Sequence, residues 1–212
     1  MKKLVIYTAV LAAGLTFGGA AIAAPWSWTG TLQAWASSGG IVDGDGDATF
    51  TLAGSGIGGT LSDTTSVTIS EQEVGGTDFY NVGLDWGTTG YAGGGSLTYT
   101  IAVTGEELIA SAALDTVELG SGTSVVKTLS DLPSGAVFAS LSSINGARDP
   151  VSGMSSFAPR TTLTVTDVIG VSTTGVLNHM DNSFVAVPEP SQASMVGLAL
   201  FGLMMARRRR RT

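Results

Sequence analysis

The sequence predicts an all-β protein: a single antiparallel β-sandwich, jelly-roll-like, between two terminal targeting segments. Three observations lead to this prediction. The middle of the 212-residue chain is rich in Thr, Val, Ser and Gly, and β-branched residues favour strands over helices. Short segments that alternate polar and apolar residues recur along it. Turn signals such as Gly75-Gly76 and Asn145-Gly146 separate these segments, as is typical of a sandwich of short strands.

The N-terminus has the three regions of a secretory signal peptide. Two lysines follow the initial methionine, and residues 4–17 form an apolar stretch of the usual length. The Ala-Ile-Ala sequence at 21–23 supplies the small residues of a cleavage site. We expect cleavage between Ala23 and Ala24, because a cut one residue later would place a proline directly after the bond. Residues 1–23 are therefore expected to be a signal peptide, with an uncleaved anchor as the alternative.

Two segments of the body show strand alternation most clearly. Residues 97–104 place Leu, Tyr, Ile and Val on one face, and residues 80–86 repeat the pattern with Tyr, Val, Leu and Trp. The glycine-rich stretch 87–95 between them predicts a loop that joins antiparallel neighbours. Further strands are expected at 28–35, 48–52, 66–74, 114–119, 124–129, 136–141, 161–169 and 183–187.

Two other stretches of the body are less regular. Residues 106–114 could form two helical turns, and residues 151–157 lack a regular pattern and predict a loop. A parallel β-helix is the alternative fold, but such solenoids are built from a repeat of fixed length, and this sequence shows none. No internal linker is visible, so residues 24–185 are expected to form one domain, with 186–191 as its tether.

Residues 186–212 have three parts with different physical properties. Pro188-Glu189-Pro190 fixes two φ angles and removes two backbone donors, so it predicts an exposed, extended peptide rather than a helix or an inner strand. Residues 191–206 carry no charge, and as a helix they would be about 24 Å long, short of the roughly 30 Å of a bilayer core. Five adjacent arginines are costly to move through hydrocarbon and predict a stop on the cytoplasmic side: Arg207, Arg208, Arg209, Arg210 and Arg211.

This order of parts resembles the PEP-CTERM sorting signal of Gram-negative bacteria, and the resemblance covers residues 186–212 only. It implies a transmembrane helix that holds the precursor transiently in the inner membrane with the body in the periplasm. It implies processing by an exosortase, a membrane enzyme that recognises the tag. It also implies a mature protein at the cell surface or outside the cell, in a bacterium that makes an extracellular polysaccharide matrix. A plain C-terminal membrane anchor with a proline-rich stalk is the alternative.

Charge is distributed unevenly between the body and the two ends. Residues 24–187 hold 16 of the 17 acids but only 3 of the 10 bases, a net charge of −13 where the whole chain carries −7. So acidic a body excludes nucleic acid as a partner, because nothing could neutralise the phosphates. It favours solubility, divalent cation binding or repulsion from other acidic polymers. The chain has no cysteine, which excludes disulfides, thiol catalysis and zinc–thiolate sites.

Asp43-Gly44-Asp45-Gly46-Asp47 is the most distinctive local motif of the body. Alternating aspartates separated by glycines can place oxygen ligands around Ca²⁺, as EF-hand loops do. The EF-hand pattern also requires a glutamate at loop position 12, and counting from Asp43 that position is Gly54. A calcium site at Asp43, Asp45 and Asp47 and a plain polar turn therefore both remain open. No other cofactor is expected.

The sequence offers little support for catalysis, and we predict no catalytic residues. His179 is the only histidine, so any Ser-His-acid or His-based metal site would have to include it. The chain has no Gly-x-Ser-x-Gly motif, and we interpret His179 as a structural or surface residue. Carboxylate pairs that could act on a glycosidic bond are Glu71 with Glu73 and Glu106 with Glu107, although acidic surface is the simpler interpretation.

Tryptophans raise a second possible function. Trp26, Trp28, Trp35 and Trp86 could stack on sugar rings, but in a small sandwich tryptophans usually pack in the core or at its edge. Exposed, coplanar tryptophans would support carbohydrate binding. The last two cations of the body, Arg148 and Arg160, bound the irregular stretch 151–157 and could pair with acids across it.

Together these features predict an exported, non-catalytic protein of the cell surface or extracellular matrix, associated with a biofilm or exopolysaccharide. Its partners would be an exosortase-type enzyme, the inner membrane during processing, and the extracellular polysaccharide. A carbohydrate-binding module for that polysaccharide is the alternative, and a secreted hydrolase is a third hypothesis.

Overall fold

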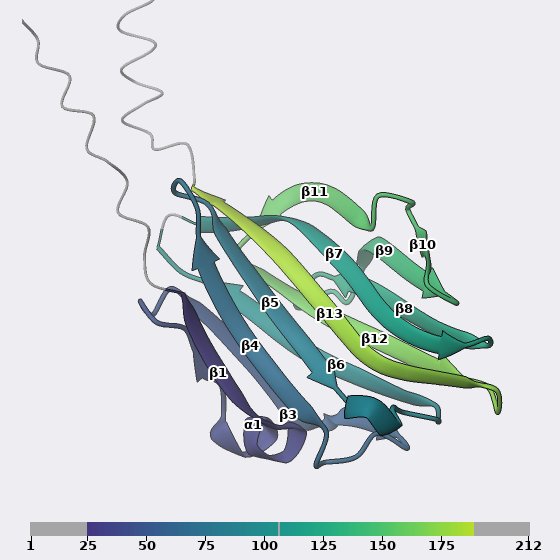
Figure 1. The fold of residues 1–212 in the computed structure, drawn as a ribbon. Helices are drawn as coiled ribbons and strands as arrows, with labels where there is room; N and C mark the ends of the chain where they lie inside the picture. Colours follow the sequence, from purple (N-terminus) through teal and green to yellow (C-terminus); the bar gives the residue numbers. More distant parts are fainter. Residues whose placement is uncertain (1–24, 106, 189–212) are drawn as a thin grey trace, which may run out of the picture.

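The computed structural model describes residues 25–105 and 107–188, which form two antiparallel sheets packed face to face (Figure 1). Two short helical segments accompany the sheets: α1 (Leu32–Ser38) and the 3-10 turn η1 (Gly87–Thr89). The predicted all-β class and the sandwich arrangement of its sheets are therefore confirmed. The sequence pattern that carried the prediction, alternation with a period of two, is the pattern that such half-buried strands require.

The first sheet has six strands in the order β1-β4-β5-β13-β7-β11. Its strands are β1 (Trp26–Thr31), β4 (Ser66–Glu73), β5 (Asp78–Asp85), β13 (Gly175–Pro188), β7 (Glu107–Gly120) and β11 (Met154–Arg160). The second sheet has seven strands in the order β10-β9-β8-β12-β6-β3-β2. Its strands are β10 (Ala147–Asp149), β9 (Val137–Ile144), β8 (Thr123–Ser130), β12 (Thr162–Val171), β6 (Gly95–Val103), β3 (Ala48–Gly59) and β2 (Ile41–Val42).

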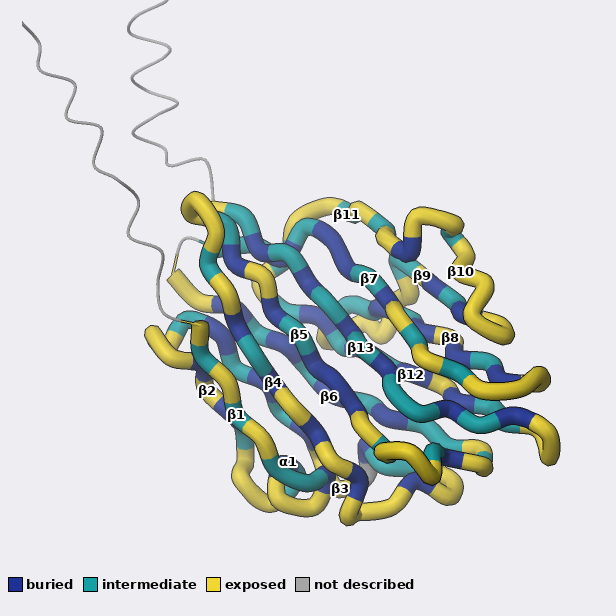
Figure 2. Tube along the Cα trace, in the orientation of Figure 1, coloured by how far each residue is buried: buried dark blue, intermediate teal, exposed yellow. Residues whose placement is uncertain are grey.

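The core lies between the inner faces of the two sheets, and Figure 2 shows the alternation of buried and more exposed residues along the strands that build it. Large side chains from both sheets meet there. The rings of Tyr99 on β6 and Phe184 on β13 pack edge to face with their centroids 6.5 Å apart. A fully buried apolar side chain of this kind stabilises the fold by about 1.5–3 kcal/mol, so the chain has a sizeable core without cysteine.

The loop prediction for residues 87–95 is wrong about the strands that it joins. β5 and β6 are not antiparallel neighbours: β5 pairs with β4 and β13 in one sheet, whereas β6 pairs with β3 and β12 in the other. The connection therefore crosses from sheet to sheet. Alternation shows that each segment is a strand, but it carries no information about the partner, which depends on packing of distant segments.

The expected strand at 28–35 is also corrected, because β1 ends at Thr31 and α1 begins at Leu32. Thr31 is the N-cap, and its hydroxyl accepts a hydrogen bond from the Ala34 N–H at 3.1 Å, the usual role of threonine at this position. Leu32 and Trp35, three residues apart, are the buried face of the helix. Gly39 ends it with a φ of 76°, a left-handed conformation that suits glycine.

Two further segments differ from or refine the sequence interpretation. The ambiguous residues after Glu106 are a strand, since β7 begins at Glu107. The expected loop at 151–157 is wrong, because β11 occupies most of it as an edge strand of the first sheet. Its partly irregular pairing with β7 and its exposed outer residues explain why no alternation was visible.

The described chain ends in the strand β13, which extends through Ala186 and Val187 to Pro188. Pro188 aligns with Glu107 at the end of the pairing with β7, so the expectation that Pro188 stays out of an inner strand is corrected. A missing N–H is tolerated there because it interrupts no later ladder bond. The predicted signal peptide and the rest of the predicted tag, 189–212, lie outside the described residues. Within the described ranges, no helix combines the length and the apolar character needed to cross a bilayer.

Candidate functional site

The Asp43–Asp47 motif forms the loop between β2 and β3, and Asp43 closes this loop. One carboxylate oxygen of Asp43 accepts the Gly46 N–H and the other accepts the Ala48 N–H, each at 2.9 Å. Gly46 has a φ of 90°, which few other residues adopt readily. Asp43 is buried, whereas Asp45 is exposed and Asp47 is half-buried. The loop thus brings ligand oxygens of its three carboxylates within 4.8 Å of one another.

A second group of acids from the first sheet meets this loop at Asp47. Asp78 is the first residue of β5 and Glu107 the first residue of β7, and these strands flank the C-terminal end of β13. Two sets of carboxylates, Asp43-Asp45-Asp47 and Asp47-Asp78-Glu107, each bring ligand oxygens within 4.8 Å of one another. We call these five residues the acidic cluster. It joins the two sheets at one end of the sandwich.

Tyr80 on β5 and Glu71 on β4 lie next to the acidic cluster. The Tyr80 hydroxyl lies 3.0 Å from Asp47 Oδ1 and 3.1 Å from Glu107 Oε2. It has a single proton, which it can donate to either oxygen. Glu71 on β4 is buried, with 6% of its surface exposed, and Asp78 is buried with 5% exposed. Carboxylates so far out of water need protons, donors or a cation as partners.

Basic residues do not supply that charge in the part of the chain that the structure describes. Lys127 donates to the Ala113 carbonyl, Arg148 pairs with Asp115, and Arg160 pairs with Asp131 at 2.6 Å. These three are the bases of the body, and each contacts a group outside the acidic cluster. The negative charge of the cluster is therefore balanced by no ion pair within the described ranges.

Burial and neighbouring acids raise the pKa values of three members of the cluster, Asp43, Asp45 and Glu107. Burial raises the pKa of Asp43 to about 8, and the neighbouring Asp47 carboxylate adds to the rise. Burial likewise raises the pKa of Glu107 to about 8, with Asp78 and Asp47 contributing. The pKa values of Asp45 and Glu71 are raised by burial and by neighbouring acids. Without a cation, the cluster therefore holds protons at neutral pH that ordinary carboxylates would have released.

This arrangement offers oxygen ligands suited to a hard divalent cation. Ca²⁺ takes about 6–8 oxygens at roughly 2.3–2.6 Å in flexible geometry, and carboxylates within 4.8 Å of one another can share such an ion. The EF-hand pattern fails at position 12 because Gly54, which lies within β3, has no side-chain carboxylate. In the folded chain, Asp78 and Glu107 lie next to the loop. They offer carboxylate oxygens that the linear motif lacks.

Sequence reasoning missed part of the acidic cluster. No local pattern marks Asp78, and Glu107 stands out only as the neighbour of Glu106. Both come to the cluster through sheet register, which no local pattern reveals. One signal is present in the sequence, however: each is an acid two residues after a glycine, Gly76 or Gly105.

The remaining residues singled out in the sequence lie away from the acidic cluster or make contacts that indicate no particular function. His179 on β13 lies 2.7 Å, by Nε2, from an Asp181 oxygen, a contact between near neighbours on one strand face. Glu73 shares the face of Glu71 on β4 and is half-buried. The two arginines beside 151–157 do pair with acids, Arg148 with Asp115 on β7 and Arg160 with Asp131 after β8.

The tryptophans divide into one buried and three half-buried side chains. Trp35 is fully buried, and its indole N–H donates to the Phe50 carbonyl at 2.9 Å. Trp26, Trp28 and Trp86 pack against the edge of the core. Trp86 also stacks on Tyr91, with centroids 5.4 Å apart. This distribution resembles ordinary packing more than a row of sugar-stacking rings.

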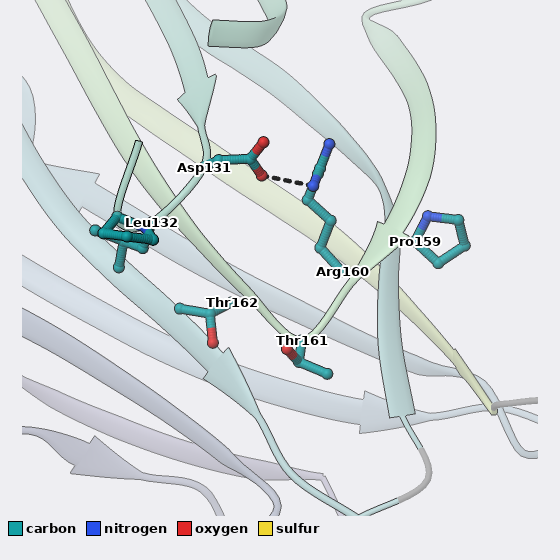
Figure 3. Close-up of a pocket in the computed structure, with 7 residues that line it drawn as sticks. Asp131, Leu132, Pro159, Arg160, Thr161 and Thr162 are labelled. Atoms are coloured by element: carbon teal, nitrogen blue, oxygen red, sulfur yellow. Dashed lines mark ion pairs between the residues drawn. The ribbon is translucent and has the colours of Figure 1, made fainter. Parts of the chain in front are cut away.

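A surface depression of about 550 Å³ lies between the end of β8 and the β11–β12 connection (Figure 3). Its lining is Asp131, Leu132, Pro133, Pro159, Arg160, Thr161 and Thr162. Figure 3 shows that its charged members point at each other, as the Asp131–Arg160 ion pair. The Arg160 guanidinium also lies 4.3 Å from the centroid of the Phe138 ring. The single acid of this depression is thus already paired and does not form the carboxylate couple of a glycosidase.

No protein-family model and no curated protein matches this chain. The resemblance of residues 186–212 to a sorting signal therefore rests on those residues themselves, and the candidate site rests on its geometry.

Proposed function

We propose that this protein is an exported, non-catalytic β-sandwich of the cell surface or extracellular matrix whose acidic cluster binds a divalent cation, with Ca²⁺ the favoured ion. One observation carries the cation-binding part: five carboxylates from two sheets converge with no base among the described residues to balance them. Calcium is favoured because all the available side-chain ligands are oxygens on a loop and two strand ends, a flexible set without histidine or sulfur.

The position of the acidic cluster suggests a role for the ion. Trp26, near the start of the described chain, aligns with Glu71, and Pro188 at its end aligns with Glu107. Both ends of the described chain therefore leave the sandwich beside the cluster. A precursor held by the proposed tag would carry this acidic end toward the anionic membrane surface, where a bound cation would reduce the repulsion.

Calcium binding is tested by thermal unfolding of the purified protein with and without Ca²⁺. At a free concentration of about 100 times Kd, binding adds about 2.7 kcal/mol to the free energy of unfolding, or a rise in Tm of roughly 5–10 °C. Asp45→Ala and Asp78→Asn should each abolish the rise, while Asp63→Asn, an exposed acid away from the cluster, should leave it intact. No rise at millimolar Ca²⁺ would contradict the proposal.

Export and sorting are proposed from the two terminal segments: a signal peptide at 1–23 and a PEP-CTERM tag processed by an exosortase. Because β13 ends at Pro188, removing residues 189–212 would leave this strand at its full length. Deleting residues 189–212 should change the location and the mature mass of the protein in cells that carry the processing enzyme. A mature C-terminus at Thr212 in those cells would contradict the sorting proposal.

Carbohydrate binding remains the second candidate, because Trp26 and Trp28 on the edge strand β1 are half-exposed and Trp26 packs over Gly44 of the acidic loop. A glycan array run with and without Ca²⁺ distinguishes a lectin-like module from a cation-stabilised structural domain. We also propose a jelly-roll-like connectivity, since strands distant in sequence are neighbours in both sheets, as Greek-key connections require.

A further inference from the structure

A lysine, an aspartate and an asparagine meet inside the core of the sandwich, away from the acidic cluster. Lys127 on β8, Asp167 on β12 and Asn182 on β13 each have 0% of their surface exposed. In the strand pairing, Lys127 lies directly opposite Asp167 in one sheet, and Asn182 faces them from the other. Each occupies a core-facing position between apolar residues, where a polar side chain is costly unless it has a specific role.

The contacts among these groups place an amine beside a carboxamide and an acid. The Asn182 side-chain nitrogen donates to Asp167 Oδ2 at 2.8 Å. The Lys127 amine donates to the Ala113 carbonyl at 2.5 Å and lies 4.7 Å from the centroid of the Phe184 ring. Ala113 aligns with Ser183, the neighbour of Asn182, in the β7–β13 pairing. The lysine amine therefore lies against the backbone of the strand that pairs with the Asn182 segment of β13.

Several polar atoms in this region lack partners within the described residues. The second oxygen of Asp167, the Asn182 side-chain oxygen and the Tyr99 hydroxyl are buried without a hydrogen bond. Noncovalent pairing thus leaves the group incompletely satisfied, in a core where unsatisfied polar atoms are destabilising.

We propose that Lys127 and Asn182 form an intramolecular isopeptide bond, promoted by Asp167, that links the two sheets covalently. The neutral Lys127 amine attacks Cγ of Asn182, and a new Nζ–Cγ bond forms. The Cγ–Nδ2 bond breaks, the protonated Asp167 carboxyl gives its proton to the leaving Nδ2, and it takes one back from Nζ. Amine plus carboxamide become a secondary amide plus ammonia, so no oxidant, reductant or other reactant is needed.

The surroundings favour each part of this step. Burial lowers the pKa of Lys127 to about 8, against the opposing effect of Asp167, which makes the nucleophilic neutral amine accessible. Burial raises the pKa of Asp167 to about 6, partly offset by Lys127, so it can act as an acid. The leaving nitrogen is already hydrogen-bonded to that acid. Exclusion of water from the core protects the product from hydrolysis.

Mass spectrometry of the full chain tests this proposal directly. The wild-type protein should be lighter by one ammonia than its sequence predicts, and trypsin should not cut after Lys127. Tandem spectra should show one species that joins the peptide containing Lys127 to the peptide containing Asn182. A wild-type mass without this loss, with normal cleavage at Lys127, overturns the proposal, and this measurement needs no variant to fold.

Variants assign the roles of the three residues. Lys127→Arg, Asn182→Ala and Asp167→Ala should each restore the full mass, the last while keeping both reacting groups. Asn81→Ala is the matched control, because Asn81 also donates to an aspartate, Asp181, at 3.0 Å, but no lysine lies beside it. Ammonia loss confined to a single peptide around Asn145-Gly146 would indicate succinimide formation and overturn the proposal. An intact cross-link in Asp167→Ala would overturn the role given to Asp167.

Discussion

The acidic cluster and the Lys127–Asp167–Asn182 group both hold ionisable side chains out of water, but they balance charge in opposite ways. The acidic cluster has five carboxylates and no base within the described chain, and it lies at an end of the sandwich that an ion can reach. The central group has one acid, one base and one amide, all fully buried. The first therefore needs a partner from outside the protein, whereas the second can reach neutrality by itself.

Because of this difference, the stability of the two regions depends on different partners. At the end of the sandwich, burial and neighbouring acids raise the pKa values of Asp43, Asp45 and Glu107, which leaves the local structure dependent on protons or a cation. In the centre, removing any one of the three residues would leave the other two buried without a polar partner for one of their groups. Changes to the central group should therefore cost far more than changes at the cluster or at the surface.

The largest effect is expected for Lys127→Met. It leaves the Asp167 carboxyl buried without the lysine nitrogen beside it, as amine or as cross-link amide, and it abolishes the proposed cross-link, so the free energy of unfolding should fall by about 3–5 kcal/mol. Urea unfolding followed by circular dichroism measures the loss. The double variant Lys127→Met with Asp167→Leu should recover part of it, because no lone acid remains. Equal losses in both proteins would break the contrast drawn between the two regions.

A smaller effect is expected from pH on the metal-free acidic cluster. The pKa values of Asp43 and Glu107 are about 8 in the folded protein, above the ordinary values of 3.8 and 4.5. The folded state therefore holds protons that the unfolded chain has released, and stability should fall as pH rises from about 5 to about 9. Melting curves in the presence of a chelator measure this slope.

Glu107→Gln provides the control for that pH series. It removes one titrating group while keeping a side chain of the same size, so the slope of Tm against pH should become shallower. A Tm that rises over the same interval would mean that the cluster is not protonated in the folded state.

The smallest effect is expected for Arg148→Ala. Its ion pair with Asp115 joins two side chains that are 40% and 56% exposed, and exposed pairs contribute about 0–1 kcal/mol. The loss should shrink further at high salt because the charges are screened. Denaturant unfolding at low and high salt measures it. A loss as large as that of Lys127→Met would show that burial does not decide the importance of charge in this protein.

The fold could be predicted from the sequence to the extent that it is local. The alternation at 97–104 and 66–74 reflects burial on one face and corresponds closely to β6 and β4. The pairing of β5 with β13, and not with β6, depends on segments far apart in the chain. The helix α1 was missed because Leu32 and Trp35 are too few apolar positions to reveal helical spacing.

The candidate sites divide in the same way. Asp43, Asp45 and Asp47 are adjacent in sequence and could be found there, whereas Asp78 and Glu107 reach them only through the sheet. The central group did leave a trace in the sequence. Lys127 stands between Val125 and Leu129 at an apolar phase of the alternation, and Asp167 and Asn182 occupy similar positions on their strands. A charged residue in that phase is the signal to look for.

The place of β13 has a mechanical consequence. This strand lies between β5 and β7, paired from His179 to Ala186 on one side and from Gly175 to Pro188 on the other, and the chain leaves it directly toward residue 189. Tension applied at that end pulls along the strand axis, so the hydrogen bonds on both sides must shear together instead of opening one at a time. A load attached at this end would therefore act on a strand that is hydrogen-bonded to neighbours along both edges.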